Sequence, residues 1–143
     1  AGRLLAKRLV GYTSSEAFRK KGICFGQLEQ RDKAIDCFNT AIEIDPSYYR
    51  AYVSRAYVYS LYKEHKKAIN DCNTAIRINS DNANGYGMRA QIYTEMRRLN
   101  DAIADYSRAI SADPKDTENY VFRAYIFASK GLYQYPKDPS AQF

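Results

Sequence analysis

The chain has 143 residues and a formal net charge of +6; 45% of its residues are hydrophobic and 27% are charged, as in one soluble globular domain with a core of its own. No apolar run approaches the ~20 residues that a membrane-spanning helix needs, and charges interrupt the apolar residues of Ala1–Val10. This argues against both a membrane span and a signal peptide.

Basic residues are concentrated at the beginning of the chain, where residues 1–12 are predicted to form a basic arm or a short helix over Leu4–Val10. Such a cluster can attract nucleic acid or an acidic partner. We favour the simpler interpretation of a solvated helix face. The basic residues before Ala34 are Arg3, Lys7, Arg8, Arg19, Lys20, Lys21, Arg31 and Lys33.

A helical repeat follows the arm. Thr13-Ser14-Ser15-Glu16 has the spacing of a capping box, which predicts the start of the first helix there. Further on, Ala34–Pro46, Ala68–Ser80 and Ala102–Pro114 are near-copies of one another at a constant interval of 34 residues. A period of this length is typical of stacked repeats. The predicted repeats cover residues 15–48, 49–82 and 83–116.

Each repeat is predicted to contain two helices. In the middle repeat, Tyr52, Ala56 and Tyr59 share one face of a first helix, and apolar residues at helical spacing from Ala68 onward form a second. The polar segment Tyr62–Lys67 is the predicted turn between them. Asp-Pro ends the first and third repeats, and it marks a helix boundary because proline lacks the backbone donor and restricts the residue before it.

Small and aromatic side chains recur in this register. The small residues allow two helices to cross closely, and we assign the aromatic residues to the core rather than to the stacking of nucleic-acid bases. The small residues are Gly22, Ala56, Ala90 and Ala124. The aromatic residues are Phe18, Tyr52, Tyr86 and Tyr120, then Phe25, Tyr59, Tyr93 and Phe127.

The fourth unit is incomplete. Residues 117–132 are predicted to form one capping helix, because the end of a repeat stack needs a polar outer face. Residues 133–143 contain two prolines and no helical periodicity, so they are predicted to form a tail.

No arrangement of residues points to catalysis, a metal or a cofactor. His65 is the one histidine and lies in a charged segment, and the glycines are scattered rather than gathered in a phosphate-binding loop. Cys24, Cys37 and Cys72 lack the tight spacing of zinc ligands. Free, buried thiols suit a reducing compartment, so we expect a cytoplasmic protein. Because the sequence shows no catalytic arrangement, we also expect that the protein is not an enzyme.

The pattern resembles that of the tetratricopeptide repeat family, W-x2-L-G-x2-Y, then A-x3-F, then P. The resemblance covers residues 13–132 and implies a right-handed, all-α solenoid of three helix pairs plus a C-terminal capping helix. Cys72 departs from it by standing where a large aromatic residue is usual, which predicts local slack. A leucine of the pattern is replaced by basic residues, which we call the basic ladder: Lys21, Arg55, Arg89 and Arg123.

We interpret the basic ladder as structural. Long basic side chains can cover apolar surface with their stems. Asp71 and Asp105 recur 34 residues apart and are predicted to pair with the ladder, whereas Cys37 stands at that place in the first repeat. Treated as exposed ion pairs, these contacts would contribute only about 0–1 kcal/mol each.

The resemblance also implies a concave groove lined by the first helices, which in this family commonly holds a peptide or a helix of a partner. We therefore predict a protein-binding module with Tyr57, Leu61 and Met88 as central anchors, and with basic groove residues that orient an acidic segment. The predicted groove residues are Arg19, Lys20, Ile23, Gln27, Arg50, Val53, Ser54, Tyr57, Leu61, Asn84, Met88, Gln91, Glu95, Val121, Phe122 and Tyr125.

One subclass of the family binds the acidic C-terminal tails of heat-shock chaperones through a clamp of Lys and Asn, then Asn, then Lys and Arg, in three successive repeats. The corresponding places here hold Arg19 and Ile23, then Ser54, then Asn84 and Met88. A shift by one repeat does not restore the clamp, so a chaperone tail is not the predicted partner.

Three alternatives stay open. The chain could be a structural subunit of a larger assembly or a fragment of a longer repeat protein. It could bind nucleic acid through its basic N-terminal end, which is the less favoured reading. It could also form a homo-oligomer. The tail, residues 133–143, could compete for the groove or dock on a neighbouring copy.

Overall fold

The computed structural model describes residues 12–131, with side chains from residue 14 onward, and this span is entirely helical. The predicted fold is confirmed: three helix pairs are followed by a single capping helix. The helices are α2 (Tyr12–Gln27), α3 (Arg31–Ile44), α4 (Tyr49–Leu61), α5 (His65–Ile78), α6 (Ala83–Glu95), α7 (Leu99–Ala112) and α8 (Thr117–Ser129). The short helix expected at Leu4–Val10 and the expected tail lie outside the described residues.

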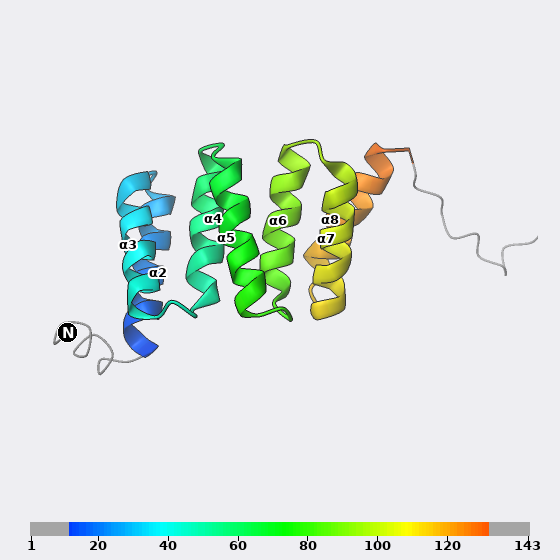
Figure 1. Ribbon diagram of the computed structural model, residues 1–143. Helices are drawn as coiled ribbons and strands as arrows, with labels where there is room; N and C mark the ends of the chain where they lie inside the picture. Colours follow the sequence, from blue (N-terminus) through cyan, green and yellow to red (C-terminus); the bar gives the residue numbers. More distant parts are fainter. Residues whose placement is uncertain (1–11, 132–143) are drawn as a thin grey trace, which may run out of the picture.

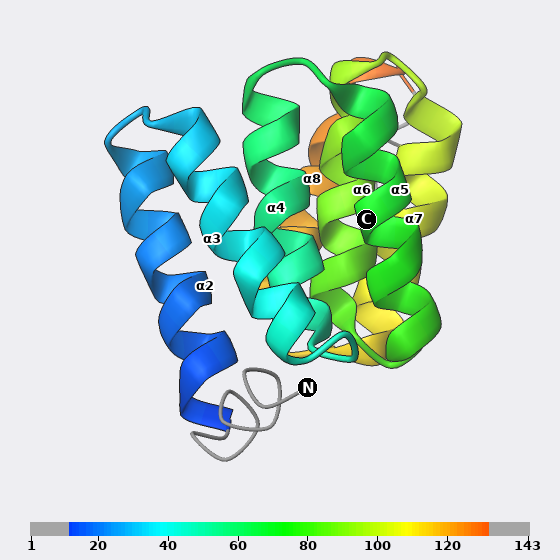
Figure 2. The ribbon, with the colours of Figure 1, turned by 60° about the vertical axis from the view of Figure 1, so that its left-hand side comes forward.

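The pairs stack side by side in sequence order, from α2 and α3 at one end to α8 at the other (Figures 1 and 2). Each first helix packs on the second helix of its own repeat, and each second helix packs on the next first helix. The first helices also contact one another, α2 with α4 and α4 with α6. The result is a layer of first helices backed by a layer of second helices.

The core lies between these layers, where small residues let the helices approach. Ala56 and Ala90 have no exposed surface, and a Cβ atom on Gly22 would lie 2.6 Å from the ring of Phe38. The largest fully buried side chains are Phe38, Val58, Ile92, Tyr106 and Ile126, together with Cys72 and Asp105.

The assignment of the repeated aromatic residues to the core is confirmed in part, since Phe25, Tyr59 and Tyr93 pack against the buried clusters. All but one of the eight aromatic residues are half-buried rather than fully buried, and Tyr120 is 39% exposed. Several of them also flank the basic ladder, with the guanidinium of Arg55 between the rings of Tyr52 and Tyr59 at 5.7 and 5.9 Å. A phenolic ring can cover a cation with its face while its hydroxyl stays wet, so these positions suit partial burial.

The turns inside the repeats are tight and alike. α5 already begins at His65, so the predicted turn Tyr62–Lys67 is in fact limited to residues 62–64. Residues with positive φ stand at the same register in each unit: Glu29 (58°), Lys63 (61°), Arg97 (61°) and Gly131 (67°). The fourth unit therefore enters the same turn as the three complete ones.

The predicted ends of the second helices are confirmed, and the predicted start of the first helix is not. Asp45, Asn79 and Asp113 follow α3, α5 and α7 in an extended conformation, and the Asp45 carboxylate accepts a hydrogen bond from the backbone N–H of Ser47 at 3.0 Å. α2 begins at Tyr12, ahead of the proposed capping box. Glu16 bonds to Arg19 and Tyr48 instead of capping the helix.

Candidate functional site

The layer of first helices carries two adjoining hollows. The first, which we call the polar hollow, has a volume of about 360 Å³, and the second, the apolar hollow, about 370 Å³. The polar hollow is lined by Arg19, Tyr49, Arg50, Val53, Ser54, Ala83, Asn84, Gly87, Met88, Gln91, Asp116, Glu118 and Asn119. The apolar hollow is lined by Ile23, Gly26, Gln27, Phe38, Val53, Ser54, Tyr57, Val58, Leu61 and Met88.

Most of the residues predicted for the groove are brought together here. Val53, Ser54 and Met88 line both hollows, so the two form one continuous surface over α2, α4, α6 and the start of α8. The other predicted residues along it are Arg19, Ile23, Gln27, Arg50, Tyr57, Leu61, Asn84 and Gln91.

Five predicted residues lie outside the two hollows. Lys20 reaches back to Glu16 at 3.6 Å, and Glu95 bonds to Ser60 and Lys63 of the preceding repeat. The ring of Phe122 stacks on Tyr106 of α7, with the ring centroids 5.8 Å apart. The remaining two, Val121 and Tyr125, are exposed on α8.

Met88 differs from its predicted role as an exposed anchor. Its side chain is only 9% exposed and belongs to a buried cluster with Ala56, Cys72 and Ile92. The small Cys72 side chain replaces the expected aromatic ring, and the long, flexible methionine packs in the same cluster. Met88 is therefore part of the floor of the hollows. Burial raises the pKa of the Cys72 thiol to about 12, so this thiol stays protonated and unreactive.

The rim of the apolar hollow is formed by side chains that protrude from α4. Tyr57 is 52% exposed and Leu61 is 51% exposed, although both side chains are large and mostly apolar. Opposite this rim, on α2, stands Gly26, where an added Cβ atom would come to 3.4 Å from Val58. The absence of a side chain there keeps the space beside Tyr57 open.

The polar hollow has a basic wall. Arg19 donates from Nε to the hydroxyl of Tyr48 at 3.0 Å and from Nη2 to Glu16 at 3.0 Å, so its charge is engaged inside the protein. This hydrogen bond and the charge of Arg19 lower the pKa of Glu16, which therefore stays ionised. Arg50 is exposed and its nearest polar contact is the long one, 3.4 Å, to the hydroxyl of Tyr49. Arg50 is the cation that a ligand can reach.

The opposite wall is acidic and was missed by the sequence reasoning. Asp116 caps α8 by accepting the backbone N–H of Glu118 at 3.0 Å, and it also accepts from Asn119 at 2.9 Å. The buried Asn119 lies against Gly87, where a Cβ atom would stand 2.9 Å from its Oδ1. One signal was available in the sequence. Where the first two repeats have the side chains of Arg19 and Val53, the third has Gly87, which leaves room for a residue of the following helix.

The basic ladder lies on the other face of the first helices, which we call the ladder face. Arg55 is bidentate to Asp71 at 2.7 and 2.7 Å, and Arg89 is bidentate to Asp105 at 2.6 and 2.9 Å. The predicted pairing is thus confirmed, but the pairs are not exposed, because Asp105 is only 1% exposed. The hydrogen bonds that Arg89 donates to Asp105 raise the pKa of Arg89 against the opposing effect of burial.

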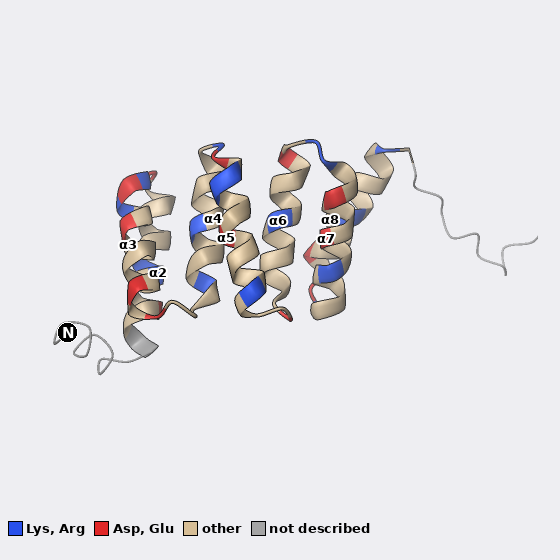
Figure 3. Cartoon of the chain, viewed as in Figure 1, with Lys and Arg blue, Asp and Glu red and all other residues tan. Residues whose placement is uncertain are grey.

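Charged residues of both signs are spread over the helices, and the turn between α6 and α7 is basic (Figure 3). The ring Nε2 of His65 lies 3.1 Å from Glu95, at the edge of the stack.

Among the described residues, no three His, Cys, Asp or Glu side chains are grouped as metal ligands. No helix between residues 12 and 131 combines the length and hydropathy of a membrane span.

Comparison with known proteins gives a family match over three consecutive segments. Models of the tetratricopeptide repeat match residues 15–48, 49–82 and 83–116. No curated relative matches the sequence of the chain.

Solved structures of similar fold include tetratricopeptide repeat (TPR) domains. The first TPR of Spaghetti (RPAP3) bound to the HSP90 peptide SRMEEVD is 24% identical, with a TM-score of 0.75, over 83% of this chain and 94% of that one. The first TPR domain of human RPAP3 is 26% identical, with a TM-score of 0.75, over 85% and 98%. The Sgt2 TPR domain from Aspergillus fumigatus is 20% identical, with a TM-score of 0.74, over 87% of each chain.

Proposed function

The chain belongs to the tetratricopeptide repeat family, and from that premise we propose that it is a non-catalytic module which holds a segment of another protein across its first helices. The observation that carries this proposal is the apolar hollow with its two half-exposed rim residues, Tyr57 and Leu61. Large apolar side chains beside a concave surface are the usual anchors of a protein interface.

The chemistry of the two hollows defines the segment that would fit. A large apolar side chain of the partner would enter the apolar hollow, between Ile23 and Leu61. In the adjoining polar hollow, Arg50 would attract an acidic side chain, and Glu118 on the opposite wall would attract a basic one. Such charges favour one orientation of the bound segment and speed its association more than they tighten the complex.

We do not propose the acidic tail of a heat-shock chaperone as the ligand. The HSP90 peptide belongs to the RPAP3 structure, which is similar to this chain in fold. Here the clamp positions hold Arg19 and Ile23, then Ser54, then Asn84 and Met88. Arg19 is already bonded to Glu16 and Tyr48, and Met88 is buried in the core, so the full set of cationic and amide donors that a tail carboxylate needs is not available.

The test is a capture experiment with a matched control. The immobilised protein is compared with a Tyr57→Ala, Leu61→Ala variant and with a Leu28→Ala, Tyr62→Ala variant. The control removes the same residue types from exposed positions that line neither hollow. We expect the first variant to lose the proteins that the parent retains, and the control to keep them, while circular dichroism stays helical for all three.

Equal retention by the parent and the Tyr57→Ala, Leu61→Ala variant would contradict the proposal. Loss of binding only when the basic residues Arg3 and Lys7 are replaced by alanine, with a steep dependence on salt, would favour nucleic acid instead, because phosphate contacts release counterions.

A further inference from the structure

Two members of the basic ladder have identical surroundings. The guanidinium of Arg55 lies over Tyr52 and Tyr59, and that of Arg89 lies over Tyr86 and Tyr93 at 5.8 and 6.0 Å. Each binds an aspartate on the second helix of its own repeat. Each also donates from Nη1 to an asparagine on the preceding second helix, Asn39 at 2.6 Å and Asn73 at 2.7 Å.

Arg123 on α8 has this arrangement in part. Its guanidinium lies 5.9 Å from the ring centroid of Tyr120, and Nη1 donates at 3.1 Å to Ser107, which stands at the register of Asn39 and Asn73. No ion pair to Arg123 is formed within residues 14–131. Among the described residues, Arg123 thus lacks the carboxylate partner that Arg55 and Arg89 find in the aspartate on the second helix of their own repeat.

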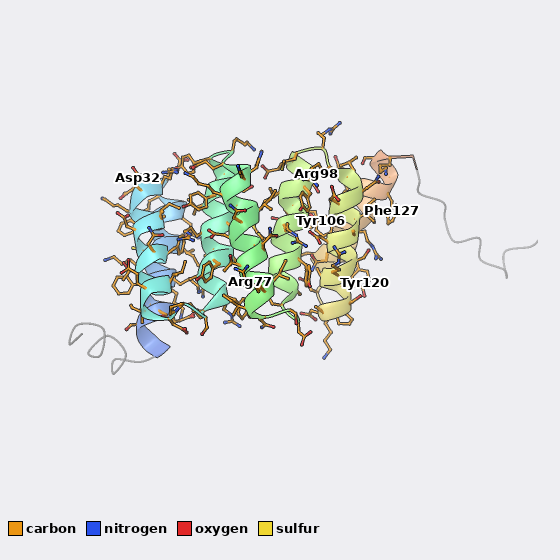
Figure 4. All side chains as sticks on the ribbon, viewed as in Figure 1. Asp32, Arg77, Arg98, Tyr106, Tyr120 and Phe127 are labelled. Carbon is orange, nitrogen blue, oxygen red and sulfur yellow. The ribbon has the colours of Figure 1, made fainter. Side chains whose placement is uncertain are left out.

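The surface around Arg123 is the one that a second helix covers elsewhere. In α6, Ala90 and Tyr93 pack on α7, and Ala90 has no exposed surface. The equivalent Ala124 of α8 is partly exposed, and Tyr120 is 39% exposed. Figure 4 labels Tyr120 and Phe127 toward the α8 end of the stack, whereas Tyr106 of α7 is buried. We call Tyr120, Arg123, Ala124 and Phe127 the open face of α8.

The sequence after Gly131 does not repeat the pattern of a second helix. Pro136 and Pro139 stand at the places that hold Ala102 and Asp105 in the third repeat. Proline in a helix interior removes a hydrogen bond and clashes with the preceding turn. The sequence of residues 132–143 therefore does not favour a helix that completes the fourth unit in register.

We propose that the open face of α8 docks an amphipathic helix of a partner protein, which supplies an aspartate to Arg123. The two complete examples define the helix: alanine stands three residues before the aspartate and four after it, as in Ala68, Asp71 and Ala75. The alanines permit close approach to Ala124, and the carboxylate forms the bidentate pair for which Arg123 is already oriented by Tyr120 and Ser107. This surface is separate from the two hollows.

The probe for this site is a peptide copy of α7, the second helix of the third repeat. A synthetic peptide with the sequence of residues 98–114 carries Ala104→Glu and Arg108→Lys, at two positions that are exposed in α7, and a lactam between these side chains holds it helical. It is titrated into the full-length, isotope-labelled protein and followed by NMR. The matched control peptide carries Asp105→Asn, which keeps the shape and removes the charge.

We expect saturable shifts confined to residues 120–127 and binding about tenfold or more weaker for the Asp105→Asn peptide, since a charge-assisted pair is lost. An Arg123→Lys protein should weaken binding of the aspartate peptide and reduce the preference between the two peptides, because lysine keeps the charge and loses the bidentate geometry. Absence of shifts on α8, equal affinity for both peptides, or shifts at Tyr57 would each overturn the proposal. A dimer seen in sedimentation without peptide, and dissociated by Arg123→Lys, would assign the face to a second copy and also overturn it.

Discussion

The groove and the ladder face are built from similar residues and differ in what faces them. Both display arginine and tyrosine on the same first helices. On the ladder face, Arg89 is enclosed by two tyrosine rings and the Asp105 carboxylate of the next helix. In the groove, Tyr57 and Arg50 have no second helix opposite them and protrude toward solvent. The comparison teaches that the opposing helix, and not the residue type, decides whether a position serves stability or binding.

The largest expected effect comes from the ladder face. Asp105→Ala should lower the free energy of unfolding by about 3–5 kcal/mol, because Arg89 is left mostly buried without its carboxylate. Urea denaturation measures the loss. Arg123→Ala is the matched control and should cost far less, since Arg123 has no carboxylate partner among the described residues. Similar losses for the two variants would break the comparison.

The second prediction concerns the floor of the groove. Met88→Ala should lower the free energy of unfolding by about 2–5 kcal/mol, because a buried side chain leaves a cavity next to Cys72. Differential scanning calorimetry measures the fall in Tm. A stability equal to that of the parent protein would show that Met88 is an exposed contact residue, as the sequence alone suggests.

A smaller effect is expected at Glu95, which belongs to neither surface. Burial raises its pKa, but hydrogen bonds from Lys63, His65 and Ser60 more than offset this, and the pKa is lowered from its usual 4.5. The folded state then gains stability above pH 4.5 and loses it as the pH falls through the lowered pKa. The contribution is about 0–1 kcal/mol, as for other exposed pairs. Unfolding measured from pH 6 to about pH 3 should show a shallower slope for Glu95→Gln, whereas an unchanged slope would remove Glu95 as a contributor.

The smallest change in stability is expected on the rim of the groove. Tyr57→Ala should alter the free energy of unfolding by no more than about 0.5 kcal/mol, because the side chain is half exposed and forms no polar contact with the other described residues. Thermal denaturation gives the value. A loss comparable with that of Met88→Ala would mean that Tyr57 is structural and would undermine its role as an anchor.

Much of the fold could be predicted because the register repeats. The constant 34-residue interval places each small residue, such as Ala56 and Ala90, at a helix crossing, and it pairs Arg55 with Asp71 and Arg89 with Asp105. Local signals also sufficed for the ends of the second helices, where Asp45 and its counterparts terminate the helix.

The exposure of individual side chains could not be read from the same register. Met88 and Ser54 occupy equivalent positions, yet only Met88 lies in a buried cluster, because Cys72 leaves room for it. The acidic wall was missed for a related reason. Asp116 and Glu118 approach Arg50 only through the stacking of non-adjacent repeats, which periodicity does not encode.

The most direct test of the account compares the two faces of the first helices by photo-crosslinking. Benzoylphenylalanine is placed at Tyr57, in the groove, and in a separate protein at Tyr86, on the ladder face. Both proteins are irradiated with the partner that the parent protein captures. The account predicts a cross-link to the partner from position 57 and none from position 86. A cross-link from position 86 alone would contradict it, because the partner would then bind the surface that we assign to stability.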